Sequence, residues 1–246
     1  MFRFLAPIIG RGQDWLLIDT DAALLDDAFG RTAAWARRRH FAATSTGDEL
    51  MVSTPSGLWR MQMLHSSITQ PVIAGLDPAM IHGGRDKPSH VAVLPAFDAD
   101  VVVCSALLDL VSASWLGHLF DRLAVPFLAC LNVDGRDTWL PCHPFDARVR
   151  TAFGRDQRRD KGFGSALGTA AVAFALRTLA ARGFVTASAP SDWRIPRTAL
   201  RMQRALIEGR GMGDAMWQEA RLLQAMRGRL AITIGHRDIL AVPPEG

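Results

Sequence analysis

Residues 99–112 read ADVVVCSALLDLVS, and this stretch decides the fold class. Three consecutive valines and a cysteine, with no polar alternation, are typical of a strand buried on both faces, as in a parallel sheet. The run ends at the small residues Ser105 and Ala106, and Asp109 follows. In open α/β sheets ligands bind outside the carboxyl ends of the strands, where an acid can orient or deprotonate them. The alternative interpretation is a core strand followed by an ordinary polar loop.

The composition indicates an ordinary globular protein. The chain has 246 residues, of which 49% are hydrophobic and 21% charged, which suits one large domain or two small ones. No apolar run reaches the roughly 20 residues of a membrane helix, and the apolar start is too short for a signal peptide. We therefore expect a cytoplasmic protein with no membrane association.

Cysteine count and charge limit the possible classes further. Three cysteines are an odd number, which favours reduced thiols over a disulfide framework or a zinc site. The net charge is +4 and the pI about 9.6, with arginines gathered at 37–39 and 155–159. Such clusters could meet nucleic acid, but they more often form solvated surfaces, so nucleic-acid binding is not expected.

A second strand that ends in acids occurs near the start of the chain. Residues 14–21 read DWLLIDTD, and Asp21 is suited to cap the helix that follows. The arrangement of strand, acid and helix is half of a βαβ unit. In nucleotide-binding α/β folds an acid at the end of the second strand accepts hydrogen bonds from ribose hydroxyls, so Asp19 is a candidate. The alternative is a helix-entry residue without a ligand.

The remaining segments alternate between strands and helices, which predicts an α/β sheet. We expect a hairpin within 50–66 and a long Pro- and Gly-rich loop over 69–92, which resembles a translated interspersed repeat and is interpreted as an insertion without a catalytic role. After the strand of 99–105, the predicted elements are a helix from Ser112 or Ser114, a strand at 125–133, a turn at 132–137, helices from 145 and over 169–182, a strand at 184–188, helices near 197–208 and 213–227, and a long bulged strand or tight hairpin over 230–242.

Few short motifs carry a chemical mechanism. The chain has no Gly-x-Ser-x-Gly, P-loop or His-Glu-x-x-His motif, and the pair at 142–143 (Cys-His) has no companions, so no metal is expected. The glycine-rich segment 162–168 opens a helix, whose amides could bind an anion. Arg158, Arg159 and Lys161 nearby are therefore candidate substrate contacts, and a helix entry packed closely against a neighbour is the alternative.

The order of these parts resembles the class I S-adenosylmethionine-dependent methyltransferases. Four segments are similar to a bacterial subgroup of that family with an unknown substrate: 105–112 (SALLDLVS), 158–164 (RRDKGFG), 190–194 (PSDWR) and 235–241 (GHRDILA). The resemblance covers nearly the whole chain except 69–92, and it depends more on the order of the segments than on any one of them.

The resemblance implies one methyltransferase-like domain over 1–246, with a three-layer Rossmann-like sheet, an antiparallel last strand and a helical insertion at 190–228. In this family a first strand and a Gly-x-Gly-x-Gly loop precede the parts seen here. The resemblance therefore implies a missing first strand, from a late start codon or a truncated gene. The vacant position would lie between the strands that end at Asp19 and Ser105, and exposed strand edges favour association.

The resemblance also implies the site. It predicts an enzyme that uses S-adenosyl-L-methionine to methylate a small molecule; a non-catalytic remnant or binding module is the alternative, and the oligomeric state stays open. The implied site residues are Asp19 and Thr20 at the ribose of the cofactor, Ser105, Ala106 and Leu107 beside its methionine part, Asp109 as the catalytic residue facing the acceptor, and Arg158, Arg159, Lys161 and Trp193 as substrate contacts.

Overall fold

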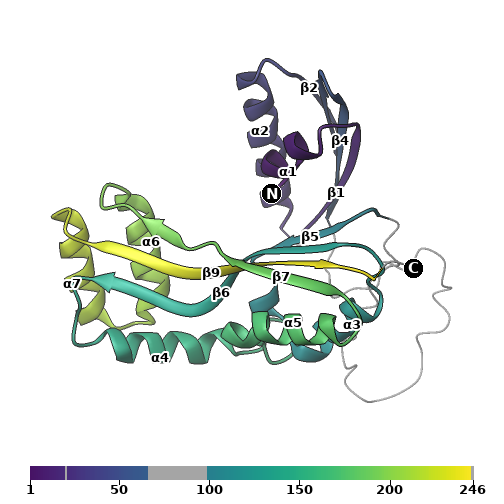
Figure 1. Cartoon of the computed structure of the whole chain (residues 1–246). Helices are drawn as coiled ribbons and strands as arrows, with labels where there is room; N and C mark the ends of the chain where they lie inside the picture. Colours follow the sequence, from purple (N-terminus) through teal and green to yellow (C-terminus); the bar gives the residue numbers. More distant parts are fainter. Residues whose placement is uncertain (20, 66–98, 245–246) are drawn as a thin grey trace, which may run out of the picture. The chain divides into compact units, whose positions relative to one another are not determined.

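The computed structural model describes residues 1–19, 21–65 and 99–244 (Figure 1). It divides into two compact units, Met1–Pro95 and Ala96–Gly246, and each is described by itself. The predicted loop at 69–92 and Thr20 lie outside the described residues. The prediction of one domain over 1–246 concerns how the two units join, and it stays a prediction.

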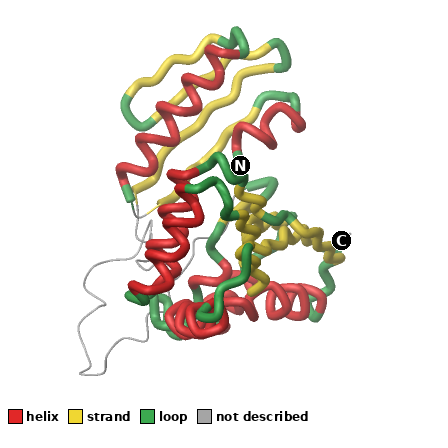
Figure 2. The backbone as a smooth tube through the Cα atoms, turned by 90° about the vertical axis from the view of Figure 1, so that its left-hand side faces the viewer, coloured by secondary structure: helices red, strands yellow, loops and turns green. Residues whose placement is uncertain are grey.

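The first unit is a four-stranded sheet with two helices. Its elements are α1 (Phe2–Ile9), β1 (Gln13–Asp19), α2 (Ala22–Arg38), β2 (Ala42–Thr46), β3 (Glu49–Thr54) and β4 (Gly57–His65). The strand order is β1-β4-β3-β2, with β1 and β4 parallel and the other two pairs antiparallel. The expected hairpin within 50–66 is confirmed as β3 and β4, whereas β2 is an element that the sequence patterns did not predict. Figure 2 shows α2 packed along this sheet.

Helix α2 begins at the predicted cap, Asp21, and buries one stripe of its surface. The Asp21 carboxylate accepts hydrogen bonds from two first-turn amides. Leu24 is 56% exposed, whereas Phe29 is buried. The buried stripe consists of Leu25, Phe29, Thr32, Ala33 and Ala36. Its spacing of three and four residues follows the helical period, which places Leu24 beside the stripe and not on it.

The second unit is a mixed sheet with helices. Its elements are β5 (Val102–Ser105), the 3-10 helix η2 (Leu108–Leu110), α3 (Ala113–Asp121), β6 (Phe127–Leu140), α4 (Asp146–Gln157), the 3-10 helix η3 (Gly168–Ala170), α5 (Ala171–Ala180), β7 (Val185–Pro190), β8 (Trp193–Ile195), α6 (Leu200–Gly211), α7 (Ala215–Met226) and β9 (Ala231–Val242). The strand order is β5-β6-β9-β7, and β8 also pairs with β9. Figure 1 shows α3, α4 and α5 along one face of this sheet.

The strand directions agree with a mixed α/β fold. Strands β5 and β6 are parallel, whereas β9 is antiparallel to β6, β7 and β8. The expected antiparallel last strand is therefore confirmed, and 230–242 forms one long strand and not a hairpin. Strands β1 and β5, which the resemblance places beside a missing strand, each stand at the end of their sheet's strand order.

Strand β6 differs from the prediction. The expected turn over 132–137 is wrong, because β6 continues to Leu140 and pairs with β9 again from Asp137 onward. The register shifts twice, between Ala129 and Asn132 and between Val133 and Asp137. Residues added to one strand only are accommodated as bulges, which bend the strand and re-aim its side chains. The composition typical of a turn therefore marks a bulge in a longer strand.

One apolar cluster of the second unit lies between strands β6, β8 and β9 and helices α4, α6 and α7. It contains Trp139, Val149, Ile195, Ile207, Trp217, Ala225, Leu230, Ile232 and Ile234. The two helices predicted near 197–208 and 213–227 are confirmed as α6 and α7. Within the part of the chain that the structure describes, no helix combines the length and the apolar character that crossing a membrane requires.

Candidate functional site

The four segments that carry the resemblance contact one another in pairs. In the first pair, the Ser191 hydroxyl donates to the Asp238 carboxylate at 2.7 Å, and the rings of Trp193 and His236 lie 4.9 Å apart. These contacts join segment 190–194 to segment 235–241.

The second pair joins segments 105–112 and 158–164. A Cβ on Gly164 would lie 3.2 Å from the Ser112 Cβ, and the Leu167 amide donates to the Val111 carbonyl at 2.9 Å. An electrostatic attraction between Asp109 and His236 connects this pair to the first. Four segments far apart in the sequence therefore surround the carboxyl end of β5.

The backbone at this end of β5 has two residues in the left-handed region. Ala106 has φ 53° and Leu131 has φ 57°. They are close because the Ala106 amide donates to the Cys130 carbonyl at 2.9 Å, and Ser105 pairs with Cys130. Left-handed backbone costs a non-glycine residue about 1–2 kcal/mol, and such strain gathers at ligand sites. Ser105 and Ala106 are also exposed, so a ligand can approach this backbone.

Replacing Ala106 with glycine is expected to raise the free energy of unfolding by about 1 kcal/mol, because glycine adopts positive φ without a Cβ penalty. Urea unfolding of both proteins measures the change. The matched control is Ala147→Gly on the exposed face of α4, where the same exchange should lower the free energy of unfolding by about 1 kcal/mol. Equal losses at both positions would contradict the strain at Ala106.

The first bulge of β6 is fixed by side chains of β6 and β9. Asp238 accepts from the Leu131 amide at 2.9 Å. Asn132 is fully buried, and its amide nitrogen donates to the carbonyls of Ala129 and Arg237, both at 3.0 Å. The Asn132 Oδ1 atom has no hydrogen-bond partner among the residues that the structure describes. Buried polar atoms are nearly always paired, so an unpaired acceptor here indicates a place for a ligand or a water molecule.

Asp109 is a second buried acceptor. Its side chain, on η2, is 7% exposed, and Oδ1 has no hydrogen-bond partner in the described part of the chain. Burial raises the pKa of this carboxyl group above its ordinary value, and attraction to His236 opposes part of that rise. A carboxyl group that retains its proton more readily than usual suits acid–base work, and such groups concentrate at functional sites.

His236 adds a proton-carrying group that the sequence analysis did not select. The residue is 4% exposed, and Nδ1 lies 3.1 Å from the Ile234 carbonyl oxygen. Its backbone amide donates to Asp192 at 3.3 Å. His236 lies inside the segment GHRDILA, so the motif indicated its neighbourhood but not its role.

Replacing Asp109 with asparagine is expected to raise the free energy of unfolding by about 1 kcal/mol at pH 7, because it removes the cost of burying a carboxylate. When the pKa of a carboxyl group is raised in the folded protein, the protein becomes less stable as the pH rises from 3.8, the ordinary pKa, through the folded pKa. The gain should therefore disappear at pH 3. Urea unfolding at pH 3 and pH 7 tests this, and an equal gain at both values would contradict it.

Asp19, the candidate ribose ligand, ends β1 and is half-buried. Its Oδ1 accepts from the Asp21 amide at 2.9 Å, which is the geometry of a helix-entry residue. Asp19 belongs to the first unit and Asp109 to the second. That these two acids face a single cofactor-sized hollow stays a prediction.

The candidate substrate contacts differ in how far their charge is already paired. Arg159 and Lys161 each lie 3.4 Å from the Asp156 carboxylate. Arg158 ends α4 and makes no ion pair with the residues that the structure describes. Trp193, on β8, is 36% exposed and keeps one side open beside His236. Leu107 is half-buried and precedes η2.

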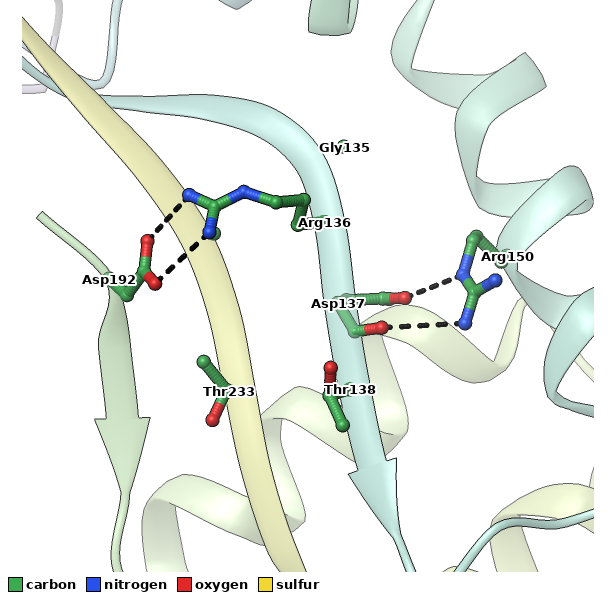
Figure 3. Close-up of a pocket in the computed structure, with 8 residues that line it drawn as sticks. Gly135, Arg136, Asp137, Thr138, Arg150, Asp192 and Thr233 are labelled. Atoms are coloured by element: carbon green, nitrogen blue, oxygen red, sulfur yellow. Dashed lines mark hydrogen bonds and ion pairs between the residues drawn. The ribbon is translucent and has the colours of Figure 1, made fainter. Parts of the chain in front are cut away.

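A polar pocket of about 290 Å³ lies at the second bulge of β6 (Figure 3). It is lined by Gly135, Arg136, Asp137, Thr138, Arg150, Asp192, Thr233 and Gly235. Arg136 contacts Asp192 at 2.8 Å, and hydrogen bonds from Arg136 hold the pKa of Asp192 below its usual range. Arg150 contacts Asp137 at 2.7 Å. The two arginines of the pocket are paired with two aspartates, so the pocket has no excess positive charge and is not a strong anion site. Its lining residue Gly235 precedes His236 in the chain.

The remaining reactive groups do not suggest other chemistry. Burial raises the pKa of Cys104 to about 12 and that of Cys130 to about 11, so neither thiol ionises at neutral pH. No group of three His, Cys, Asp or Glu side chains is placed to hold a metal ion in the ranges 1–19, 21–65 and 99–244.

Comparisons with solved structures show similarity at a coarse level. No family model and no curated protein matches the chain. Among solved structures, the chain is similar to geranyl diphosphate methyltransferase in complex with SAM, with 10% identical residues, a TM-score of 0.35, and coverage of 95% of this chain and 78% of that one. Similarity at this level assigns neither a family nor an activity to the chain.

Proposed function

We propose that this protein transfers a methyl group from S-adenosyl-L-methionine to a small-molecule acceptor. The observation that supports this proposal is the gathering of four segments around the carboxyl end of β5, in the order that resembles class I methyltransferases. Asp109, in the first of these segments, is buried, and its Oδ1 has no hydrogen-bond partner among the described residues.

The reaction needs little covalent help from the protein. The acceptor atom attacks the methyl carbon in line with the sulfur, and the carbon–sulfur bond breaks with its electron pair left on sulfur. Positioning supplies most of the acceleration, and a carboxyl group such as Asp109 orients the acceptor or its proton. S-adenosylmethionine supplies the activated methyl group. The exposed, strained backbone at Ser105 and Ala106, with Leu107 after it, suits its methionine part.

The other positions follow from the same proposal. Asp19 and Thr20 would hold the ribose hydroxyls of the cofactor. Arg158, Arg159, Lys161 and Trp193 would face the acceptor. Among the three cations, Arg158 is the best placed to meet a substrate anion, because Asp156 already pairs the other two.

Calorimetry with S-adenosylhomocysteine tests the proposal on this chain and on a chain extended upstream in its reading frame. Binding by either chain would support the proposal, and binding by neither would contradict it. Ser105→Trp should abolish binding by filling the exposed end of β5. The matched control, Ser114→Trp on the exposed side of α3, should leave binding unchanged.

The second candidate is a non-catalytic binding module with the same fold. It is favoured by the position of β1 and β5, which are edge strands in their sheets. Binding of S-adenosylhomocysteine without methylation of any acceptor would support this alternative.

A further inference from the structure

We propose that His236 is the proton acceptor of this site, and that the substrate is therefore a molecule whose accepting oxygen or nitrogen carries a proton, such as a phenol or an amine. This inference rests on the methyl transfer proposed above. It assigns to His236 a role that the sequence resemblance leaves open.

The tautomer of His236 follows from its hydrogen bond. Nδ1 lies 3.1 Å from the Ile234 carbonyl oxygen, and a carbonyl oxygen only accepts. Nδ1 therefore carries the hydrogen, and Nε2 has a free lone pair in the neutral ring. No described side chain or backbone group donates to Nε2. The ring is thus fixed at one nitrogen and basic at the other, as a general base requires.

Three residues from the elements packed against β9 interact with the side chain or the backbone of His236. The carboxyl group of Asp109, on η2, attracts His236 electrostatically. Asp192, before β8, accepts from the His236 backbone amide at 3.3 Å. The Trp193 ring lies 4.9 Å from the imidazole and tilted by 46°. The partly exposed indole offers an apolar surface for the acceptor beside the imidazole.

The proton balance of the step defines the substrate class. The acceptor forms a bond to the methyl carbon, the carbon–sulfur electron pair stays on sulfur, and the acceptor proton moves to Nε2 and later to solvent. A carboxylic acid is already ionised at neutral pH and needs no such base, whereas a phenol or an ammonium group does. The structure therefore favours phenols and amines over carboxylic acids.

The first experiment is independent of catalysis. Ring nitrogen-15 NMR of the full chain, with the signals assigned through His236→Asn, determines the tautomer between pH 5 and pH 9. We expect hydrogen on Nδ1 and a lone pair on Nε2 in the neutral ring. Hydrogen on Nε2 in the neutral ring would overturn the inference, because that nitrogen could not accept a proton.

The second experiment uses the same variant. In His236→Asn the side-chain amide can still donate to the Ile234 carbonyl, whereas Nε2 is lost. With S-adenosylmethionine and a panel of phenols, primary amines and carboxylic acids, we expect phenol or amine methylation that falls about 100-fold in the variant and loses its acid limb in the pH profile. Affinity for S-adenosylhomocysteine should stay unchanged.

The outcomes separate the two proposals. If neither this chain nor the upstream-extended chain binds S-adenosylhomocysteine, methyl transfer is wrong, and the substrate class inferred from it is wrong too. If the cofactor product binds but carboxylic acids are the substrates, or if His236→Asn keeps the full rate with an unchanged pH profile, methyl transfer stands and the role of His236 is wrong.

Discussion

Replacing Arg221 with alanine is expected to lower the free energy of unfolding by about 4 kcal/mol, because it leaves a carboxylate without its partner in the core. Arg221, on α7, is fully buried between the Trp139 and Trp217 rings. Its guanidinium contacts both oxygens of Asp146, at 2.5 and 2.6 Å, and donates to the Pro141 carbonyl at 2.6 Å. This network joins α7 to the end of β6 and the start of α4.

The matched control is Arg148→Ala, which breaks an ion pair with Asp214 on the surface of the same unit. Because the Arg148 side chain is 59% exposed, water replaces much of that pair, and the expected loss is under about 1 kcal/mol. Urea unfolding of both variants measures the difference. Equal losses would show that the buried network contributes no more than a surface pair.

The pH dependence of the same network has a definite sign. Burial alone would raise the pKa of Asp146, but hydrogen bonds from Trp217 and Arg221 outweigh it and hold the pKa below the ordinary 3.8. A lowered folded pKa gives stability that is present above pH 3.8 and is lost as pH falls through the folded value. The difference between the wild-type chain and Arg221→Ala should therefore shrink below pH 3.8.

Local sequence signals predicted most elements because their causes are local. The helix cap at Asp21 needs only its own first turn, and the hairpin of β3 and β4 needs only the turn residues between them. The long strand at 231–242 was predictable from its apolar run. These features depend on residues a few positions apart, which a single sequence contains.

The second bulge of β6 could not be predicted in this way. Residues 134–136 (Asp-Gly-Arg) have the composition of a turn. What keeps them within a strand is the pairing of the flanking residues Val133 and Asp137 with β9, a hundred residues later in the chain, together with the ion pair of Arg136 with Asp192. Long-range pairing overrides local propensity here, as is common in sheets.

The residues of the candidate site differ in the same way in how far the sequence alone indicates their surroundings. Asp109 follows directly from the end of an apolar strand, and the structure places it in a buried, electrostatically coupled position. The sequence analysis did not select His236, because its burial and its interaction with Asp109 depend on the pairing of β9 with strands far away in the sequence. The pairing of Arg159 and Lys161 with Asp156 also depends on the three-dimensional path of the loop after α4.

Replacing Gly235 with alanine is expected to lower the free energy of unfolding by about 3 kcal/mol, since the bulge of β6 folds directly over this residue. A Cβ at Gly235 would lie 2.3 Å from Asp134 Oδ1, 2.7 Å from the Arg136 Cβ and 3.0 Å from the Arg136 carbonyl oxygen. The last two atoms belong to the backbone or lie next to it, so rotating one side chain cannot relieve the contact. The bulge itself must move.

The matched control is Gly117→Ala in α3, where a Cβ meets no atom within 4 Å. There the same exchange should raise the free energy of unfolding by about 0.5–1 kcal/mol, because alanine favours the helix. Opposite signs for the two variants in urea unfolding would confirm that Gly235 is required for space. A loss below about 0.5 kcal/mol at Gly235 would mean that the bulge shifts freely. The ion pair between Arg136 and Asp192 would then not fix the position of Asp192, which accepts from the His236 amide.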